Sequence, residues 1–275
     1  MKSDTLEIRL KAFHLPSFVA HYEELSQKAE KAGWGHVGYL ETLSELEADE
    51  RQSRRVERLL REARLPRDKT LATLELERLP ATVRNQVRAL CEGQFLAGAT
   101  NICAFGNPGT GKTHVVSAIG HELVRRGYSV CFSAVSALVE KLLVAKRDLQ
   151  LTRELKRLDR FECLILDDIG YVQQDREEME VLFTLLSERY ERSSVMITSN
   201  LVFSKWDQIF KDPMTTAAAI DRVVHHSIIL ELNVPSYRVE VAQRRKTVKT
   251  GSTAGESRPV KVDPGESNSP KKTED

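Results

Sequence analysis

A glycine-rich octapeptide carries the clearest chemistry in this 275-residue chain. It has the pattern G-x-x-x-x-G-K-T, follows the apolar run 102–105 and opens the amphipathic stretch 112–126. In such a strand–loop–helix context, backbone N–H groups surround phosphate oxygens and the helix dipole favours an anion. We therefore expect a nucleoside triphosphate to bind here. The octapeptide consists of Gly106, Asn107, Pro108, Gly109, Thr110, Gly111, Lys112 and Thr113.

Two side chains of the octapeptide have separate expected roles. The Lys112 ammonium is expected to reach the β- and γ-phosphates, and the Thr113 hydroxyl to ligate Mg²⁺. A chance glycine-rich turn before a helix is the alternative, and the full eight-position match disfavours it.

A pair of carboxylates follows the apolar run 163–166. Ligands of open α/β sheets sit at the carboxyl ends of the strands, where Asp167 and Asp168 would emerge. We expect Asp167 to hold the Mg²⁺ shell and Asp168 to orient or deprotonate the attacking water. A strand that merely ends in a polar turn would look the same, but its place downstream of the phosphate loop favours catalysis.

Three later polar residues are candidates for sensing the phosphates. Asn200 ends the apolar run 195–199 and could hydrogen-bond the γ-phosphate or the lytic water. Arg222 is a candidate finger toward the γ-phosphate of a neighbouring subunit, and Arg238 a candidate sensor within its own subunit. Strand ends are commonly polar and arginines commonly lie on the surface, so each has an ordinary structural alternative.

Apolar runs and helical patterns alternate over most of the chain. This alternation predicts an α/β fold, a parallel five-stranded sheet with helices on both faces. The expected strands are 101–105, 129–134, 162–167, 194–199 and 227–232. The expected helices around them are 112–126, 135–147, 176–190 and 217–225, with another at 81–95.

Composition changes along the chain divide it into three expected parts. Residues 1–66 read as a small all-helical N-terminal domain, in which a glycine-rich break at 33–38 precedes a helix running to about residue 63. Residues 67–245 are expected to form the ATPase domain. Residues 246–275 contain Ser, Pro, Gly and charges without periodicity, and we expect a disordered tail there.

Bulk composition excludes several classes of protein. The net charge is +1, so any nucleic-acid contact must come from local clusters. No apolar run approaches 18 residues and the start is charged, so we expect a cytoplasmic protein with no membrane association. His225 and His226 lack partners at metal-ligand spacing, and we interpret them as structural. The widely spaced cysteines predict buried reduced thiols; they are Cys91, Cys103, Cys131 and Cys163.

The order of these motifs resembles that of an AAA+ P-loop ATPase. In detail the chain resembles the branch containing DnaC-type helicase loaders and the IstB transposition helpers of bacterial insertion sequences. The segments that look like IstB in particular are 10–16, 39–50, 64–71, 106–114 and 166–170. The resemblance covers about residues 5–245.

The resemblance implies an activity, cofactors and partners. It implies an ATPase that uses ATP and Mg²⁺, forms a homo-oligomer with ATP at subunit interfaces, and captures double-stranded target DNA for a cognate transposase. It adds His114 to the cofactor-binding set. Asp168 stands where the wider class usually has Glu, so turnover is expected to be slow. A DnaC-type replicative helicase loader is the main alternative, and a small-molecule phosphotransferase is a third class.

Basic clusters suggest where DNA would bind. The N-terminal cluster forms i,i+4 pairs with glutamates, so a salt-bridged helix is an equal alternative; its members are Arg51, Arg54, Arg55, Arg58 and Arg61. The resemblance directs two other clusters to a central channel; they are Lys141, Lys146 and Arg147, then Gln173, Gln174 and Arg176. No aromatic residues alternate with them, which favours phosphate contacts over base stacking.

Overall fold

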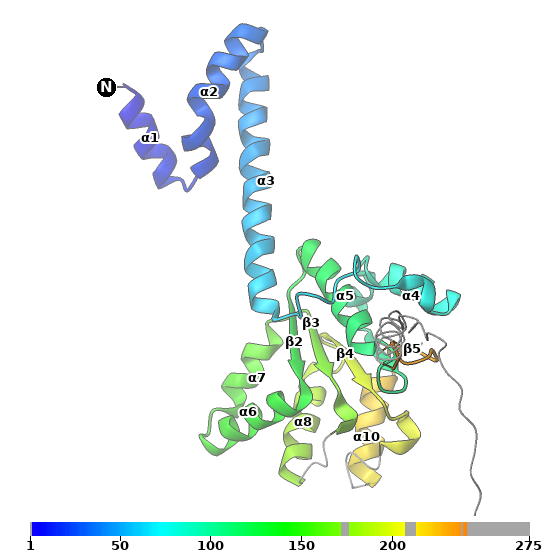
Figure 1. Ribbon diagram of the computed structural model, residues 1–275. Helices are drawn as coiled ribbons and strands as arrows, with labels where there is room; N and C mark the ends of the chain where they lie inside the picture. Colours follow the sequence, from blue (N-terminus) through cyan, green and yellow to red (C-terminus); the bar gives the residue numbers. More distant parts are fainter. Residues whose placement is uncertain (1, 172–175, 207–212, 238, 241–275) are drawn as a thin grey trace, which may run out of the picture. The chain divides into compact units, whose positions relative to one another are not determined.

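The computed structural model describes residues 2–171, 176–206, 213–237 and 239–240 (Figure 1). Met1–Ser236 forms one compact unit and Tyr237–Asp275 a second, of which only residues 237, 239 and 240 are described. The expected tail, residues 246–275, therefore lies outside the described residues. In the part of the chain that is described, no helix combines the length and apolar character that crossing a membrane requires.

A five-stranded, all-parallel sheet forms the centre of the larger unit, which confirms the predicted fold class. The strand order is β2-β3-β4-β1-β5. Sheets covered on both faces need strands that are apolar throughout, and β1, β3 and β4 are buried along nearly their whole length. The strands are β1 Asn101–Phe105, β2 Val130–Ala134, β3 Cys163–Asp167, β4 Ser194–Ser199 and β5 Ser227–Glu231.

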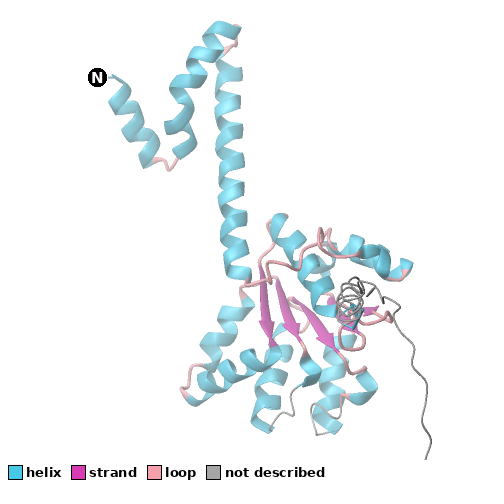
Figure 2. Ribbon diagram, viewed as in Figure 1, coloured by secondary structure: helices cyan, strands magenta, loops and turns pink. Residues whose placement is uncertain are grey.

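Helices pack on both faces of this sheet (Figure 2). Cys103 and Phe105 of β1 face one core, which also contains residues of α6, α7, α8 and α10. Ile102 and Ala104 face the other core, with α4, α5 and the end of α3. The bounds are α4 Ala81–Leu90, α5 Lys112–Arg125, α6 Val135–Arg147, α7 Leu151–Asp159, α8 Arg176–Arg189 and α10 Pro213–Val224. Short 3-10 turns are Leu76–Arg78, Gln94–Gly98, Ile169–Tyr171 and Phe203–Lys205.

Some helix boundaries differ from those expected. The helix expected at 81–95 ends at Leu90, and the helix expected at 217–225 begins earlier, at Pro213. Helix α7 was not predicted, although Leu151, Leu155 and Leu158 lie at helical spacing and pack against the core.

Three helices precede the sheet, as expected from their apolar periodicity. They are α1 Lys2–Ala12, α2 Pro16–Ala32 and α3 His36–Ala63. Proline is favourable in the first turn of α2, and Gly33 ends that helix in the left-handed conformation at φ 67°. The glycine-rich break is shorter than predicted, because α3 already begins at His36 and includes Gly38.

The last turns of α3 belong to the core of the sheet. Leu59 and Ala63 are buried with residues of α5, and Arg55 donates a hydrogen bond to the carbonyl of Gly127 (3.1 Å). A domain boundary near residue 66 remains a prediction.

The four cysteines are buried and none forms a disulfide, as predicted. Burial raises the pKa of Cys103 and of Cys163 to about 12, so both thiols stay protonated near neutral pH.

Candidate nucleotide site and basic surfaces

The predicted phosphate loop connects β1 to the first residue of α5. Gly109 and Gly111 adopt φ 84° and 95°, values that glycine reaches without steric cost. The loop ends at Lys112, whose Nζ donates to the carbonyls of Gly106 (2.7 Å) and Asn107 (3.0 Å). The lysine ammonium is therefore directed at the loop and not away from it.

Two glycines of this loop have different surroundings. A Cβ on Gly106 would lie 2.7 Å from the Leu232 carbonyl oxygen and from Thr110 Oγ1, so no side chain fits there. A Cβ on Gly111 would meet nothing within 4 Å, so the loop borders open space at that point. Open space, a lysine ammonium, a threonine hydroxyl and a helix N-terminus fit a polyphosphate and its Mg²⁺.

The carboxylate pair is held by a residue that the sequence analysis did not single out. Thr198 of β4 donates its hydroxyl proton to Asp167 Oδ1 (2.7 Å) and accepts the backbone N–H of Asp168 (2.8 Å). Its side chain is almost fully buried, at 1% exposure. One hydroxyl thereby fixes the carboxylate of Asp167 and the backbone of Asp168, and Asp167 keeps its Oδ2 atom for a cation. A polar residue near the end of a predicted strand was the available signal.

Asp168 and Asn200 meet around a tight turn. Asp168 adopts the left-handed conformation at φ 66°, which costs energy for a non-glycine residue and is often found at functional sites. A Cβ on Gly170 would lie 2.1 Å from Asn200 Oδ1, so only glycine lets this asparagine approach the turn after Asp168. That oxygen is buried and has no hydrogen-bond donor among the described residues. The structure thus brings Asn200 to Gly170, two residues after Asp168.

His114 lies beside the phosphate loop but contacts a different segment. Its Nε2 is 3.1 Å from the Thr70 carbonyl oxygen and 3.1 Å from Thr73 Oγ1. One face of α5 continues this pattern, with His121 Nε2 3.0 Å from the Pro66 carbonyl oxygen. These contacts fasten the segment before α4 to the helix that begins at the phosphate loop. A nucleotide contact by His114 remains a prediction.

Arg222 lies at the edge of the sheet opposite its own phosphate loop. It is near the end of α10, where Val223 accepts a hydrogen bond from Asn101 at the start of β1 (3.1 Å). A five-residue strand spans about 17 Å, which separates that edge from the loop. The guanidinium contacts Ser187 Oγ and lies 4.5 Å from the centroid of the Phe183 ring. Arg238 lies outside the described residues.

The basic residues predicted to contact DNA mostly have acidic partners. Lys141 pairs with Glu154 (2.5 Å), Lys146 with Glu180 (3.0 Å) and Arg147 with Asp148 (3.1 Å). Arg176 is exposed and makes no hydrogen bond or ion pair with another described residue. Gln173 and Gln174 lie outside the described residues.

The unpredicted helix α7 adds a second basic surface, around an open cleft of about 520 Å³. Within the described chain, the side chains of Arg153, Lys156 and Arg160 have no hydrogen-bond or ion-pair partner. Glu154 forms ion pairs with Arg157 (2.6 Å) and with Lys141 (2.5 Å). The residues around the cleft are Ala145, Gln150, Arg153, Glu154, Lys156, Arg157 and Arg160.

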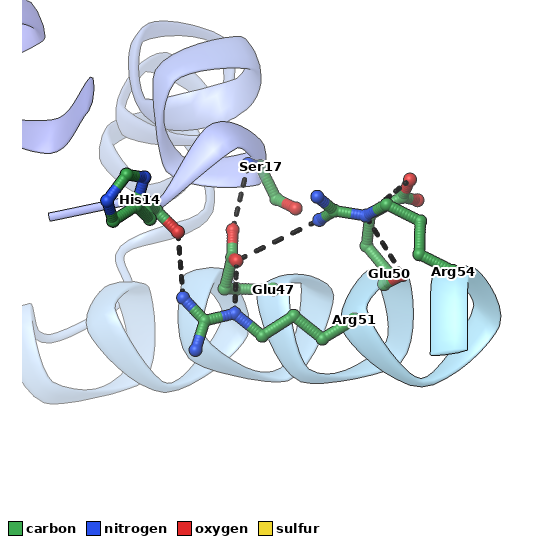
Figure 3. Close-up of polar contacts among 6 residues, drawn as sticks. All are labelled: His14, Ser17, Glu47, Glu50, Arg51 and Arg54. Atoms are coloured by element: carbon green, nitrogen blue, oxygen red, sulfur yellow. Dashed lines mark hydrogen bonds and ion pairs between the residues drawn. The ribbon is translucent and has the colours of Figure 1, made fainter. Parts of the chain in front are cut away.

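Two arginines of α3, Arg51 and Arg54, have acidic partners, unlike the unpaired cations around the cleft (Figure 3). Glu47 is 4% exposed and accepts hydrogen bonds from the Ser17 backbone N–H (2.9 Å) and Arg51 Nε (2.6 Å). Arg51 also donates to the His14 carbonyl (2.8 Å), and Arg54 lies within 3.9 Å of Glu47. This network joins the α1–α2 turn to α3, which favours the salt-bridged interpretation for Arg51 and Arg54.

Comparisons with known proteins support ATP binding. Residues 8–246 match the family model described as "IstB-like ATP binding protein". An insertion sequence ATP-binding protein of Sinorhizobium fredii is 44% identical over 88% of this chain and 81% of its own length. The IS21 insertion sequence ATP-binding protein of Pseudomonas aeruginosa is 35% identical over 90% of this chain and 93% of its own.

Solved structures share the fold. AMPPCP-bound DnaA from Aquifex aeolicus aligns with a TM-score of 0.53 at 19% identity, covering 68% of this chain and 57% of that one. The crystal structure of DnaI aligns with a TM-score of 0.50 at 21% identity, covering 63% and 94%. These likenesses show the AAA+ fold alone, whereas the family match spans nearly the whole described chain. The chain belongs to the IstB-like ATP-binding family.

Proposed function

We propose that this protein hydrolyses ATP to regulate target capture for a transposase, as an oligomer on double-stranded DNA. The names of its relatives support the insertion-sequence context. The observation that carries the enzymatic part is the clamp by Thr198, which fixes Asp167 and Asp168 one strand away from the phosphate loop.

Each residue of the nucleotide site has a distinct role in the proposed hydrolysis. When bound, Mg²⁺ supplies positive charge beside the β- and γ-phosphates; Thr113 and Asp167 Oδ2 are the residues that would hold it. Lys112 balances the charge of the same phosphates. Asp168 orients or deprotonates the attacking water, and Asn200 hydrogen-bonds the γ-phosphate or that water.

A second subunit completes the proposed site. Arg222 lies at the sheet edge opposite its own phosphate loop, so it can serve only a neighbouring subunit. To do so, its guanidinium would leave Ser187 and the Phe183 ring. An arginine that reaches the γ-phosphate stabilises the charge of the transition state, an effect of about 10³–10⁵ in rate. A finger that acts between subunits requires a homo-oligomer with ATP bound at its subunit interfaces.

The proposed DNA surface combines the predicted residues with α7. Lys141, Lys146, Arg147 and Arg176 remain candidates, although acidic partners offset the first three. Arg153 and Lys156 of α7 and Arg160 directly after it have no partner among the described residues, and they add positive charge at an open cleft. Such a surface suits the phosphate backbone and not particular bases. A DnaC-type helicase-loader role is the alternative, and the insertion-sequence names of the relatives favour transposition over it.

The nucleotide assignment is tested with two variants. Lys112→Ala should abolish ATP binding, because the charge paired with the β- and γ-phosphates is lost. Asp168→Asn should keep ATP binding and stop hydrolysis, which traps an ATP-bound assembly on double-stranded DNA. Asp148→Asn, on the exposed end of α6, is the matched control and should hydrolyse normally. Normal hydrolysis by Asp168→Asn would show that the catalytic assignment is wrong.

The subunit interface is tested by mixing. Arg222→Ala subunits keep an intact phosphate loop, and Lys112→Ala subunits keep an intact finger. Mixed assemblies should therefore regain some ATPase activity that neither variant has alone. No recovery in mixtures that demonstrably co-assemble would contradict a finger acting between subunits. Stimulation of the ATPase by double-stranded DNA, more than by single-stranded DNA, separates the transposition role from a helicase loader.

A further inference from the structure

Three exposed side chains converge at the amino edge of the sheet, away from the phosphate loop. Glu191 lies in the turn after α8, and His225 and His226 lie between α10 and β5. Their ligand atoms all lie within 4.8 Å of one another. Glu191 Oε1 is 4.0 Å from His225 Nδ1 and 3.8 Å from His226 Nε2. No metal-ligand partner lies at short spacing from these histidines in the sequence. The structure supplies Glu191, which lies 34 residues before His225.

The fold itself brings these two turns together. The turn with Glu191 leads into β4, the turn with the histidines leads into β5, and β1 alone separates these strands. Glu191 adopts a left-handed conformation, φ 56°, that reverses the chain after α8. Because α8 and α10 also pack against one core, both turns are anchored at each end. The cluster is therefore set by the core and not by chance meetings of mobile side chains.

We propose that Glu191, His225 and His226 bind a divalent transition-metal ion of the zinc type. Two imidazole nitrogens and one carboxylate form a donor set that zinc prefers, whereas Mg²⁺ and Ca²⁺ prefer oxygen ligands. Zinc bonds of about 2.0–2.1 Å in a tetrahedron place ligand atoms about 3.4 Å apart. The observed separations need shifts of about 1 Å or less per side chain, and half-exposed side chains accommodate such shifts.

Tyr190 distinguishes this site from a simple hydrogen-bonded cluster. Its hydroxyl lies 2.9 Å from His225 Nδ1, the atom nearest Glu191. The phenol hydroxyl can donate its proton to that nitrogen and thereby compete with a metal for it. Removing the hydroxyl should therefore leave metal binding intact or strengthen it. A cluster held together only by hydrogen bonds would gain no metal affinity from the change.

The site is separate from the proposed Mg²⁺ position. Asp167 lies at the carboxyl end of β3, whereas Glu191 precedes the amino end of β4. Ligand loss at the cluster should therefore leave Mg²⁺-ATP binding unchanged. Metal binding at the cluster does not depend on the nucleotide chemistry, so the tests of the metal site and of the proposed function have independent outcomes.

The test is titration of Zn²⁺ into the full, nucleotide-free, tag-free chain by calorimetry. The expected result is one ion per chain, with binding at least about tenfold weaker in Glu191→Gln, His225→Gln and His226→Gln. The matched control is His21→Gln, because His21 and Glu24 form an exposed pair at the same 4.0 Å distance without a third ligand. This control should bind like the wild type, and Tyr190→Phe should bind at least as tightly. Equal Zn²⁺ binding by the wild type and all three cluster variants would overturn the proposal.

Co²⁺ gives a second readout that does not depend on stability. Its visible absorption bands report nitrogen ligation and geometry, and they should appear with the wild type and vanish with Glu191→Gln. That variant changes one exposed oxygen to nitrogen, so it should keep the thermal midpoint and the Mg²⁺-ATP affinity of the wild type. If a histidine variant fails to fold, Glu191→Gln decides alone. Unchanged Co²⁺ bands in Glu191→Gln would contradict a site that includes this carboxylate.

Discussion

Helices α3 and α7 are both rich in arginine, yet they use the charge in opposite ways. On α3, Arg51 and Arg54 converge on the buried Glu47 and thereby attach the α1–α2 turn (Figure 3). On α7, Arg153, Lys156 and Arg160 point into an open cleft and have no acidic partner among the described residues. The two groups of basic residues therefore differ in the placement of their counter-charges.

This contrast separates stabilising charge from binding charge. A cation beside a carboxylate gains less from a phosphate, because the neighbouring negative charge offsets part of its attraction. An unpaired exposed cation releases counterions from DNA at its full strength. The contrast leads to five expected outcomes, from the largest effect to the smallest.

The largest effect is expected for the combined change of Arg153, Lys156 and Arg160 to Gln. Each phosphate contact contributes about 0.9 to the slope of log K against log salt, which corresponds to about 500-fold for three contacts at 0.1 M salt. The slope should flatten by about 2.7 in a filter-binding salt titration, similarly for unrelated sequences. An unchanged slope would show that α7 does not contact phosphates. Unfolding by urea should be unaffected, since all three side chains are exposed.

Glu47→Gln should have the next largest effect, on stability. The free energy of unfolding should fall by about 2 kcal/mol, because hydrogen bonds to a charged group contribute about 1.5–3 kcal/mol. Urea unfolding measures the loss, and Glu50→Gln is the control, since its ion pair with Arg54 is exposed and long at 3.5 Å. A loss as large in the control would mean that burial of Glu47 does not matter.

The same carboxylate predicts a pH dependence. Burial raises the pKa of Glu47, but the hydrogen bonds from Ser17 and Arg51 outweigh it, and the net pKa lies below the ordinary value. A lowered pKa stabilises the fold at pH values above the unfolded value of about 4.3, and this contribution disappears as the pH falls through the folded value. The stability difference between wild type and Glu47→Gln should therefore be full at pH 7 and shrink below about pH 4. A difference independent of pH would rule out the charge as its cause.

A smaller effect is expected for Lys146→Gln with Arg147→Gln. Because Glu180 and Asp148 already offset these charges, the loss of DNA affinity should stay below about tenfold, despite two basic residues being removed. The same salt titration measures it. A loss equal to that of the α7 variant would break the distinction between paired and unpaired cations.

The smallest effect is expected for Arg58→Gln with Arg61→Gln. Neither arginine has a partner among the described residues, but unlike Arg153, Lys156 and Arg160 they do not line the cleft. The adjacent Glu57 and Glu62 also lower the local positive charge. DNA affinity should change less than about twofold and the free energy of unfolding less than about 0.5 kcal/mol. A large loss of DNA affinity would extend the DNA surface to α3, and only the anchored arginines would then be structural.

The sequence alone determined the strands and the phosphate loop, whereas helix α7 was missed. Each predicted strand lies within one residue of an observed strand, because buried parallel strands require apolar runs that are visible locally. The loop was predictable because glycine at φ 84° and 95°, followed by Lys112, leaves a signature in consecutive positions. Asp167 and Asp168 were also predictable, because they directly follow an apolar run that indicates a buried strand.

Tertiary structure decided which side chains meet. Thr198 holds Asp167 from 31 residues away, Glu191 meets His226 across 35, and Glu47 receives the Ser17 N–H across 30. Periodicity and propensity act over a few residues, so they carry no information about such contacts. Packing of the helices on the sheet fixes these distances, and it therefore decides which arginines stabilise the fold and which remain available to a partner.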